Sequence, residues 1–324
     1  MHQKISTNPA MDHERRRKAM APNVQMNGSE IPNGIKKSIA KRKITNTLLA
    51  WDELPAWQQD NHRIHSGYRP ESNSHCKSIY SLGYLHNETV NIYTLLLGMI
   101  AAIVLCLVVL NVARSRYSSA AWSDVVAIGA FFISALACLG MSASYHTLSN
   151  LSPRISNLSN KLDLLGIVLL IWGSMVSIIY YGWDCERTIK IAYCTMMTVF
   201  GAACAFLTLS PKVRAPKWRA FRALIFVLLG LSAIIPVVHG VFLYGMTVVN
   251  TRIVFVPWLL TEALMYILGA VVYAVRFPES NFPGKFDIWG SSHQIFHVLV
   301  VLGAAAHLVA LVHSFDYNLT SGRC

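Results

Sequence analysis

The sequence predicts an all-α membrane protein, a bundle of seven transmembrane helices with a cytosolic N-terminus and a C-terminus outside. The chain of 324 residues is 54% hydrophobic and only 14% charged, which is too apolar for a soluble domain of this size. After residue 90 it consists of apolar runs of about 20 residues, the length that crosses a bilayer as a helix. The net charge of +12 lies in an N-terminal tail and in short loops, where it indicates membrane topology and not nucleic-acid binding.

Two polar segments precede the first apolar run. Residues 1–45 are basic and read as a disordered cytosolic tail. Residues 46–92 form a cytosolic amphipathic or linker segment, in which Trp51 and Trp57 stand among acids and amides. This pattern predicts a short amphipathic helix on the membrane face, broken near Pro55 and followed by a turn at 67–70. An ordinary packed linker is the alternative.

The transmembrane domain is expected over residues 93–316, with residues 317–324 as a short outer tail. Each gap between apolar runs carries charged or turn residues, which gives the number of spans. Pro236 is expected to kink the fifth helix. The predicted spans are 93–114, 125–148, 162–181, 189–209, 221–243, 254–275 and 294–316.

The orientation follows from lysine and arginine, which are enriched in cytosolic loops. With the N-terminus inside, the tail and inner loops hold 22 of these residues and the outer segments hold 6. The same orientation places the end of the second span, the start of the third and the start of the seventh near the inner leaflet.

Polar residues gather at these three ends. His293 and His297 begin the seventh span four residues apart, so a helix presents both on one face. Ser142 and His146 have the same spacing at the end of the second span, and Asp163 stands near the start of the third. Polar groups at this depth are costly without partners, so the histidines either bind neighbouring helices or hold a metal.

A zinc ion is the metal that these residues suit. Three histidines with one open position are typical of catalytic zinc, and a nearby Asp163 can orient or deprotonate a water at the metal. Ser142 can hydrogen-bond Asp163 or a substrate carbonyl, or its own helix backbone. The stretch from His293 to His297 lacks the glutamate of the H-E-x-x-H motif, so any base must come from elsewhere.

Three other polar residues fall inside apolar runs. His239 and His307 are expected to be core histidines satisfied by packing. Glu262 in the sixth span is expensive in lipid and is expected to face the bundle interior.

Several stretches carry a resemblance to a known family. They are W-D-E-L-P-A-W-Q-Q-D-N with G-Y-R-P, H-N-E-T-V-N-I-Y-T, S-A-S-Y-H-T, K-L-D-L-L-G-I, and F-P-G-K-F-D-I-W-G-S-S-H-Q-I-F-H-V-L-V-V. Together they resemble the progestin and adipoQ receptor family, which includes adiponectin receptors, hemolysin III-type proteins and fungal Izh-type members. The resemblance covers about residues 50–316, its last stretch is highly specific, and the fungal branch is the preferred placement.

The resemblance implies zinc held by His146, His293 and His297, with Asp163 reaching the metal through water. It also implies a receptor, a ceramidase-type lipid amide hydrolase, or a protein of zinc and lipid homeostasis. One position departs from the family motif E-x-x-N-x-x-x-H. Glu88 and Asn91 fit it, but Leu95 stands where histidine is usual.

Two functions therefore remain open. The first is a zinc-dependent hydrolase of ceramide-like amides, with Asp163 and Ser142 in catalytic roles and membrane lipid as the partner, ceramide or fatty acid inside the bundle. The second is a receptor with a structural zinc, which would need an extracellular protein ligand. A zinc transporter fits less well, because the ligands cluster at one face instead of following a path. The expected location is the plasma membrane rather than the endoplasmic reticulum.

Overall fold

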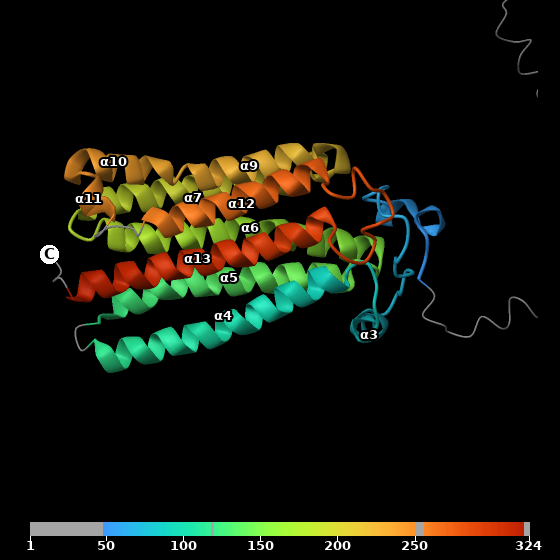
Figure 1. Ribbon diagram of the computed structural model, residues 1–324, viewed down its shortest axis with the longest axis horizontal. Coiled ribbons are helices and arrows are strands. Elements are labelled where there is room, and N and C mark those ends of the chain that lie inside the picture. Colours follow the sequence, from blue (N-terminus) through green and yellow to red (C-terminus); the bar gives the residue numbers. More distant parts are fainter. Residues whose placement is uncertain (1–47, 118–119, 251–255, 321–324) are drawn as a thin grey trace, which may run out of the picture. The chain divides into compact units, whose positions relative to one another are not determined.

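The computed structural model describes residues 48–117, 120–250 and 256–320. Within these residues the protein is all-helical, and seven of its helices are long and apolar enough to cross a membrane (Figure 1). The one β-type pairing in the described part is an isolated bridge between Leu49 and Tyr68. The predicted fold class and number of spans are confirmed, and the direction of insertion stays a prediction. The proposed tail of residues 1–45 lies outside the described residues.

The transmembrane helices run nearly parallel or antiparallel along the bundle (Figure 1). Six of the seven extend beyond the predicted spans: the first begins at residue 89, the third begins at residue 153 instead of 162, and the last continues to residue 320, through half of the predicted outer tail. The spans are α4 (Thr89–Arg116), α5 (Trp122–Leu148), α6 (Pro153–Gly182), α7 (Arg187–Leu209), a fifth span over Pro216–Tyr244, α12 (Val256–Val275) and α13 (Ser292–Thr320).

Helices α5 and α6 pack closely because small residues face each other along them. A Cβ on Gly166 would lie 2.9 Å from the Cα of Cys138, and one on Gly173 would lie 2.1 Å from the Oγ of Ser134. Glycine at these positions lets the two backbones approach, as is common between helices in membranes. The short connection ends at Ser152, whose Oγ caps the start of α6, and this pairing places the end of α5 beside the start of α6.

The fifth span is interrupted near its middle, as Pro236 predicts. It consists of η4 (Pro216–Trp218), α9 (Arg219–Leu231) and α10 (Ile234–Tyr244). Proline lacks an N–H, and its ring clashes with the carbonyl four residues earlier, which here belongs to Ser232. The break falls at that point, between α9 and α10.

The segment before α4 differs from the amphipathic helix expected there. Around Pro55 it forms two three-residue turns, η1 (Trp51–Glu53) and η2 (Ala56–Gln58). Nearer to α4 it forms a short helix, α3 (His75–Tyr80), and a further turn, η3 (Ser81–Gly83). Leu54 and Ile64 are buried against the protein, at 6% and 7% exposure, and do not face lipid. Around Pro55 the segment therefore packs against the protein, since proline stops helix growth and the apolar side chains find partners within the fold.

This segment is attached to the connection between α12 and α13. The predicted turn is present, with Gly67 at φ +85°, and a Cβ on Gly67 would lie 2.6 Å from Ile288. Asp287 accepts hydrogen bonds from the backbone of His65 at 2.9 Å and from Ser66 at 2.7 Å. The segment and this connection lie at the same end of the bundle (Figure 1).

A buried polar chain joins three helices elsewhere in the bundle. Glu262 on α12 is 4% exposed, and its carboxylate lies 2.8 Å from the Nδ1 of the fully buried His307 on α13. The Nε2 of His307 lies 3.3 Å from Ser177 on α6.

His239 on α10 lies 2.7 Å from the hydroxyl of Tyr193 on α7. Glu262 faces the bundle interior and both histidines have partners, as expected.

Replacing Glu262 with leucine should destabilise the protein by about 1–3 kcal/mol, because Nδ1 of His307 then remains buried without a partner. The double variant Glu262→Leu/His307→Leu should recover much of this loss, since neither polar group is left behind. Thermal unfolding in detergent measures both variants. A double variant no more stable than the single one would contradict the pairing.

Candidate metal centre

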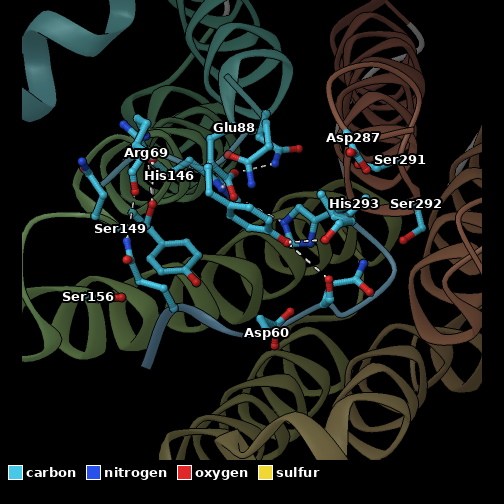
Figure 2. Close-up of a pocket in the computed structure, with 18 of the residues that line it drawn as sticks. Asp60, Arg69, Glu88, His146, Ser149, Ser156, Asp287, Ser291, Ser292 and His293 are labelled. Atoms are coloured by element: carbon cyan, nitrogen blue, oxygen red, sulfur yellow. Dashed lines mark hydrogen bonds and ion pairs between the residues drawn. The ribbon is translucent and has the colours of Figure 1, made fainter. Parts of the chain in front are cut away.

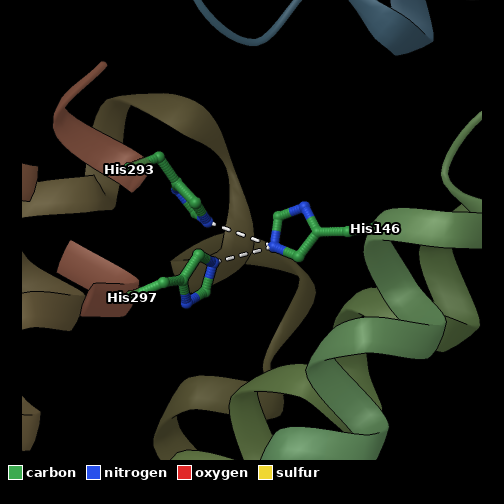
Figure 3. Close-up of side chains that lie close together, drawn as sticks. All are labelled: His146, His293 and His297. Atoms are coloured by element: carbon green, nitrogen blue, oxygen red, sulfur yellow. Dashed lines mark hydrogen bonds between the residues drawn. The ribbon is translucent and has the colours of Figure 1, made fainter. Parts of the chain in front are cut away.

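Three histidines meet between α5 and α13 (Figure 3). The Nε2 of His146 lies 3.0 Å from the Nε2 of His297 and 3.3 Å from the Nε2 of His293. One ligand atom from each residue lies within 4.8 Å of the other two. His146 and His297 are buried, at 3% and 4% exposure. Helical spacing aligns the pair on α13, and the fold brings α5 to meet them.

The geometry of these nitrogens fits a tetrahedral zinc ion. Zinc binds imidazole nitrogen at about 2.0–2.1 Å, so two tetrahedral nitrogen ligands lie roughly 3.3–3.4 Å apart. The two observed separations, 3.0 and 3.3 Å, are close to this value. Three imidazole nitrogens facing one point in an apolar bundle are also the donor set that zinc accepts.

Glu88 orients the histidine from α5. Its Oε2 lies 2.7 Å from the Nδ1 of His146 and accepts a hydrogen bond of 2.7 Å from Asn91. The carboxylate holds the ring proton at Nδ1 and leaves the lone pair of Nε2 facing the other two histidines. Carboxylate–histidine pairs of this kind fix the tautomer and orientation of metal ligands.

The immediate surroundings keep Glu88 in its charged form. Burial alone raises the pKa of Glu88, but its interaction with the ring of His146 and the hydrogen bond from Asn91 outweigh it, so the pKa lies below its ordinary range. Burial lowers the pKa of His86 to about 4. Neutral His86 accepts a 3.1 Å hydrogen bond from the backbone N–H of Glu88. The backbone before α4 is thereby held in place.

The C-terminal end of α5 is held by Arg69, which is 3% exposed. Its guanidinium donates to the carbonyls of His146 and Thr147 and to the hydroxyls of Ser81 and Ser149. A cation at the C-terminus of a helix is favourable because the last carbonyls lack helical partners. Arg69 therefore fixes the turn of α5 that carries His146.

The start of α13 is held in a similar way by Glu279, which is fully buried. Its carboxylate accepts from the backbone N–H and the hydroxyl of Ser292 and from Asn61. Gln294 accepts from the backbone N–H of Gly290 at 2.6 Å. Satisfying the free N–H groups of the first turn fixes the position of His293, which lies between these contacts.

Asp163 and Ser142 lie inside the bundle beside this cluster. Asp163 is 8% exposed and Ser142 is 3% exposed. The two side chains interact across α5 and α6, but the Oγ of Ser142 has no partner at ordinary hydrogen-bond geometry among the described residues. Asp163 is not one of the grouped ligand atoms. Its catalytic role stays a prediction.

A polar pocket of about 160 Å³ reaches the cluster from the end of the bundle that the N-terminal segment covers (Figure 2). Glu88, His146, His293, Asp60 and Arg219 are among the residues that line it. The pocket has room for several water molecules. It therefore gives water a route to two of the three histidines.

Glu88 can be recognised from the sequence as a motif residue, but its contact with His146 cannot. The spacing E-x-x-N pairs Glu88 with Asn91 on one helical face, and this was the available signal. Leu95, which replaces the family's usual histidine, is 1% exposed and packs against Leu139 and Ala143 of α5. It belongs to an apolar contact between α4 and α5.

Comparison with known proteins gives the family. The sequence profile described as "Haemolysin-III related" matches residues 83–308. The chain is 42% identical to the ADIPOR-like receptor IZH2 of Saccharomyces cerevisiae over 275 residues, which cover 85% of this chain and 86% of that protein. It is 38% identical to the ADIPOR-like receptor IZH1 of Eremothecium gossypii, with 89% of each chain covered. It is 39% identical to the adiponectin receptor protein of Drosophila melanogaster, covering 85% of this chain and 61% of the other.

The chain therefore belongs to the haemolysin-III-related, progestin and adipoQ receptor family, and it is a multi-pass integral membrane protein. The expected placement near fungal members agrees with its similarity to two fungal receptors.

Replacing Glu88 with alanine should weaken zinc binding about 10- to 100-fold, because His146 loses the carboxylate that orients it. His297→Ala should lose most of the zinc, since it removes a ligand. Competition with a chelator measures both affinities in purified protein. Glu71→Ala is the matched control, because Glu71 is exposed in the segment that precedes α4. Unchanged affinity in Glu88→Ala would contradict the orienting role.

Proposed function

We propose that this protein is a zinc-dependent hydrolase of lipid amides of the ceramide type, whose products act in signalling and in lipid and zinc homeostasis. The observation that carries the proposal is a group of three histidine nitrogens reached by a polar pocket. Structural zinc sites are normally closed by four protein ligands. Among the described residues the group that could hold a metal has three members, which leaves a position for substrate or water.

Bound zinc would supply a Lewis acid and lower the pKa of a coordinated water to about 7. His146, His293 and His297 would hold it, and Glu88 would keep the Nε2 of His146 available. Asp163 would take a proton from the attacking water and return it to the leaving amine nitrogen. A carbon–oxygen bond forms, the amide carbon–nitrogen bond breaks, and the products are a fatty acid and an amine. Membrane lipid would bring the acyl chain, and the pocket would bring the water.

A receptor with a structural zinc is the second candidate function. The names of the relatives, adiponectin receptor and ADIPOR-like receptor, favour it. In that case zinc joins α5 and α13 at one end of the bundle, and an extracellular protein ligand acts on the other side. The plasma membrane is the proposed location under both functions.

Replacing Asp163 with asparagine separates the two functions. The change keeps the size and removes the base, so zinc should remain bound while amide hydrolysis falls on the order of 10²–10⁴-fold. Zinc content and ceramide turnover are measured on the same preparation, with and without chelator. Full zinc with unchanged turnover would remove Asp163 as the base. A zinc-loaded wild type that hydrolyses none of a panel of ceramides would favour the receptor.

The proposed orientation has its own test. With the N-terminus in the cytosol, a tag at the N-terminus should resist protease added to intact cells, and a tag at the C-terminus should be digested, because lysine and arginine are enriched on the cytosolic side. Immunoblots of both tags decide this. Digestion of the N-terminal tag from outside would place the histidine cluster near the outer leaflet.

A further inference from the structure

Tyr145 lies directly beside the metal centre. It precedes His146 on α5, and the centroids of the two rings are 4.9 Å apart. Tyr145 also lines the polar pocket, together with Glu88, His146 and His293. The turn of α5 that places the metal-binding nitrogen therefore also places this phenol.

The hydroxyl of Tyr145 is free to bind a ligand. The pocket is lined by two tyrosines, and the hydroxyl of Tyr68 lies 3.3 Å from the carbonyl of Asn61 and 3.1 Å from that of Ile64. Within the described part of the chain the hydroxyl of Tyr145 has no hydrogen-bond partner, and it is not among the unpaired polar atoms sealed inside the protein. A phenol of this kind has one proton to donate into the pocket.

The two arginines that line the pocket bind protein groups through their terminal nitrogens. Arg69 donates to the end of α5, and Arg219 is bound to Asp60. Nδ1 of His146 is bound to Glu88. The hydroxyl of Tyr145, unpaired among the described residues, thus belongs to the same pocket as two of the three histidines, His146 and His293.

Amide hydrolysis requires a hydrogen-bond donor for the carbonyl oxygen, and a hydroxyl can act as that donor. When water adds to the carbonyl carbon, negative charge develops on the carbonyl oxygen. A donor aimed at that oxygen typically contributes 10²–10³ in kcat. The acid product carries its charge on the same oxygen, so the donor also favours the bound carboxylate.

We propose that the hydroxyl of Tyr145 donates a hydrogen bond to the carbonyl oxygen of the lipid amide, and to the carboxylate of the fatty acid released from it. This catalytic role rests on the proposed hydrolase function. Tyr145 keeps its proton throughout. The proton that the leaving nitrogen gains comes from the attacking water, so no further reactant is needed.

The test uses full-length Tyr145→Phe, which keeps the ring against His146 and removes only the hydroxyl. Zinc content and thermal stability should match wild type. The kcat for a C18 ceramide should fall about 10²–10³-fold, with KM little changed. The Kd for palmitate, titrated into zinc-loaded protein, should rise about ten- to a hundredfold. The matched control is Tyr193→Phe, which removes a hydroxyl bound to His239 and should leave the kcat and the palmitate Kd unchanged.

The outcomes separate this inference from the proposed function. A hydrolysing wild type with an equally active Tyr145→Phe variant would overturn the donor role and leave the hydrolase standing. If wild type hydrolyses no amide, the hydrolase fails and the palmitate titration decides. Weaker palmitate binding in Tyr145→Phe than in wild type then supports the donor, whereas equal affinity, or no palmitate binding to wild type, overturns it.

Discussion

A polar group inside a membrane-spanning bundle must find its partner within the protein, and most of the described polar structure follows from this constraint. His146, His293 and His297 face a common point, and Glu88 accepts the remaining ring proton of His146. Farther along α13, His307 meets Glu262 under the same constraint. One helix thus carries two polar contacts with different consequences. In the histidine cluster, nitrogen lone pairs face a common point where a metal could bind. In the second contact, Glu262 and Ser177 bind both ring nitrogens of His307.

The metal centre also depends on how the two helix ends are held. Arg69 binds the last carbonyls of α5, and Glu279 binds the first turn of α13. Both residues lie outside the transmembrane helices, and both contacts satisfy backbone or hydroxyl groups at a helix end. The N-terminal segment and the connection between α12 and α13 therefore act as parts of the site, because they set where its ligands lie.

The proposed hydrolase function depends on a small set of polar groups inside the bundle. The proposed hydrolase would use the three histidine nitrogens, the pocket that reaches two of them, the buried carboxylate of Asp163 and the hydroxyl of Tyr145. The pocket lies toward the aqueous end, while the outer faces of the helices are apolar. Water and a lipid tail would therefore approach from different directions, and the amide would lie where they meet.

The sequence by itself determined the seven spans, the interruption near Pro236, the family, and the three histidines as a candidate set. These properties depend on hydrophobic length, on the missing N–H of proline and on four-residue helical spacing, all of which are local. The tertiary structure decided that Glu88 orients His146, that Arg69 and Glu279 hold the two helix ends, and that Leu54 and Ile64 are buried instead of lying on lipid. It also decided that Leu95 packs between helices and that the hydroxyl of Tyr145 has no hydrogen-bond partner among the described residues. Such outcomes depend on which distant side chains meet, and no spacing along one helix specifies that.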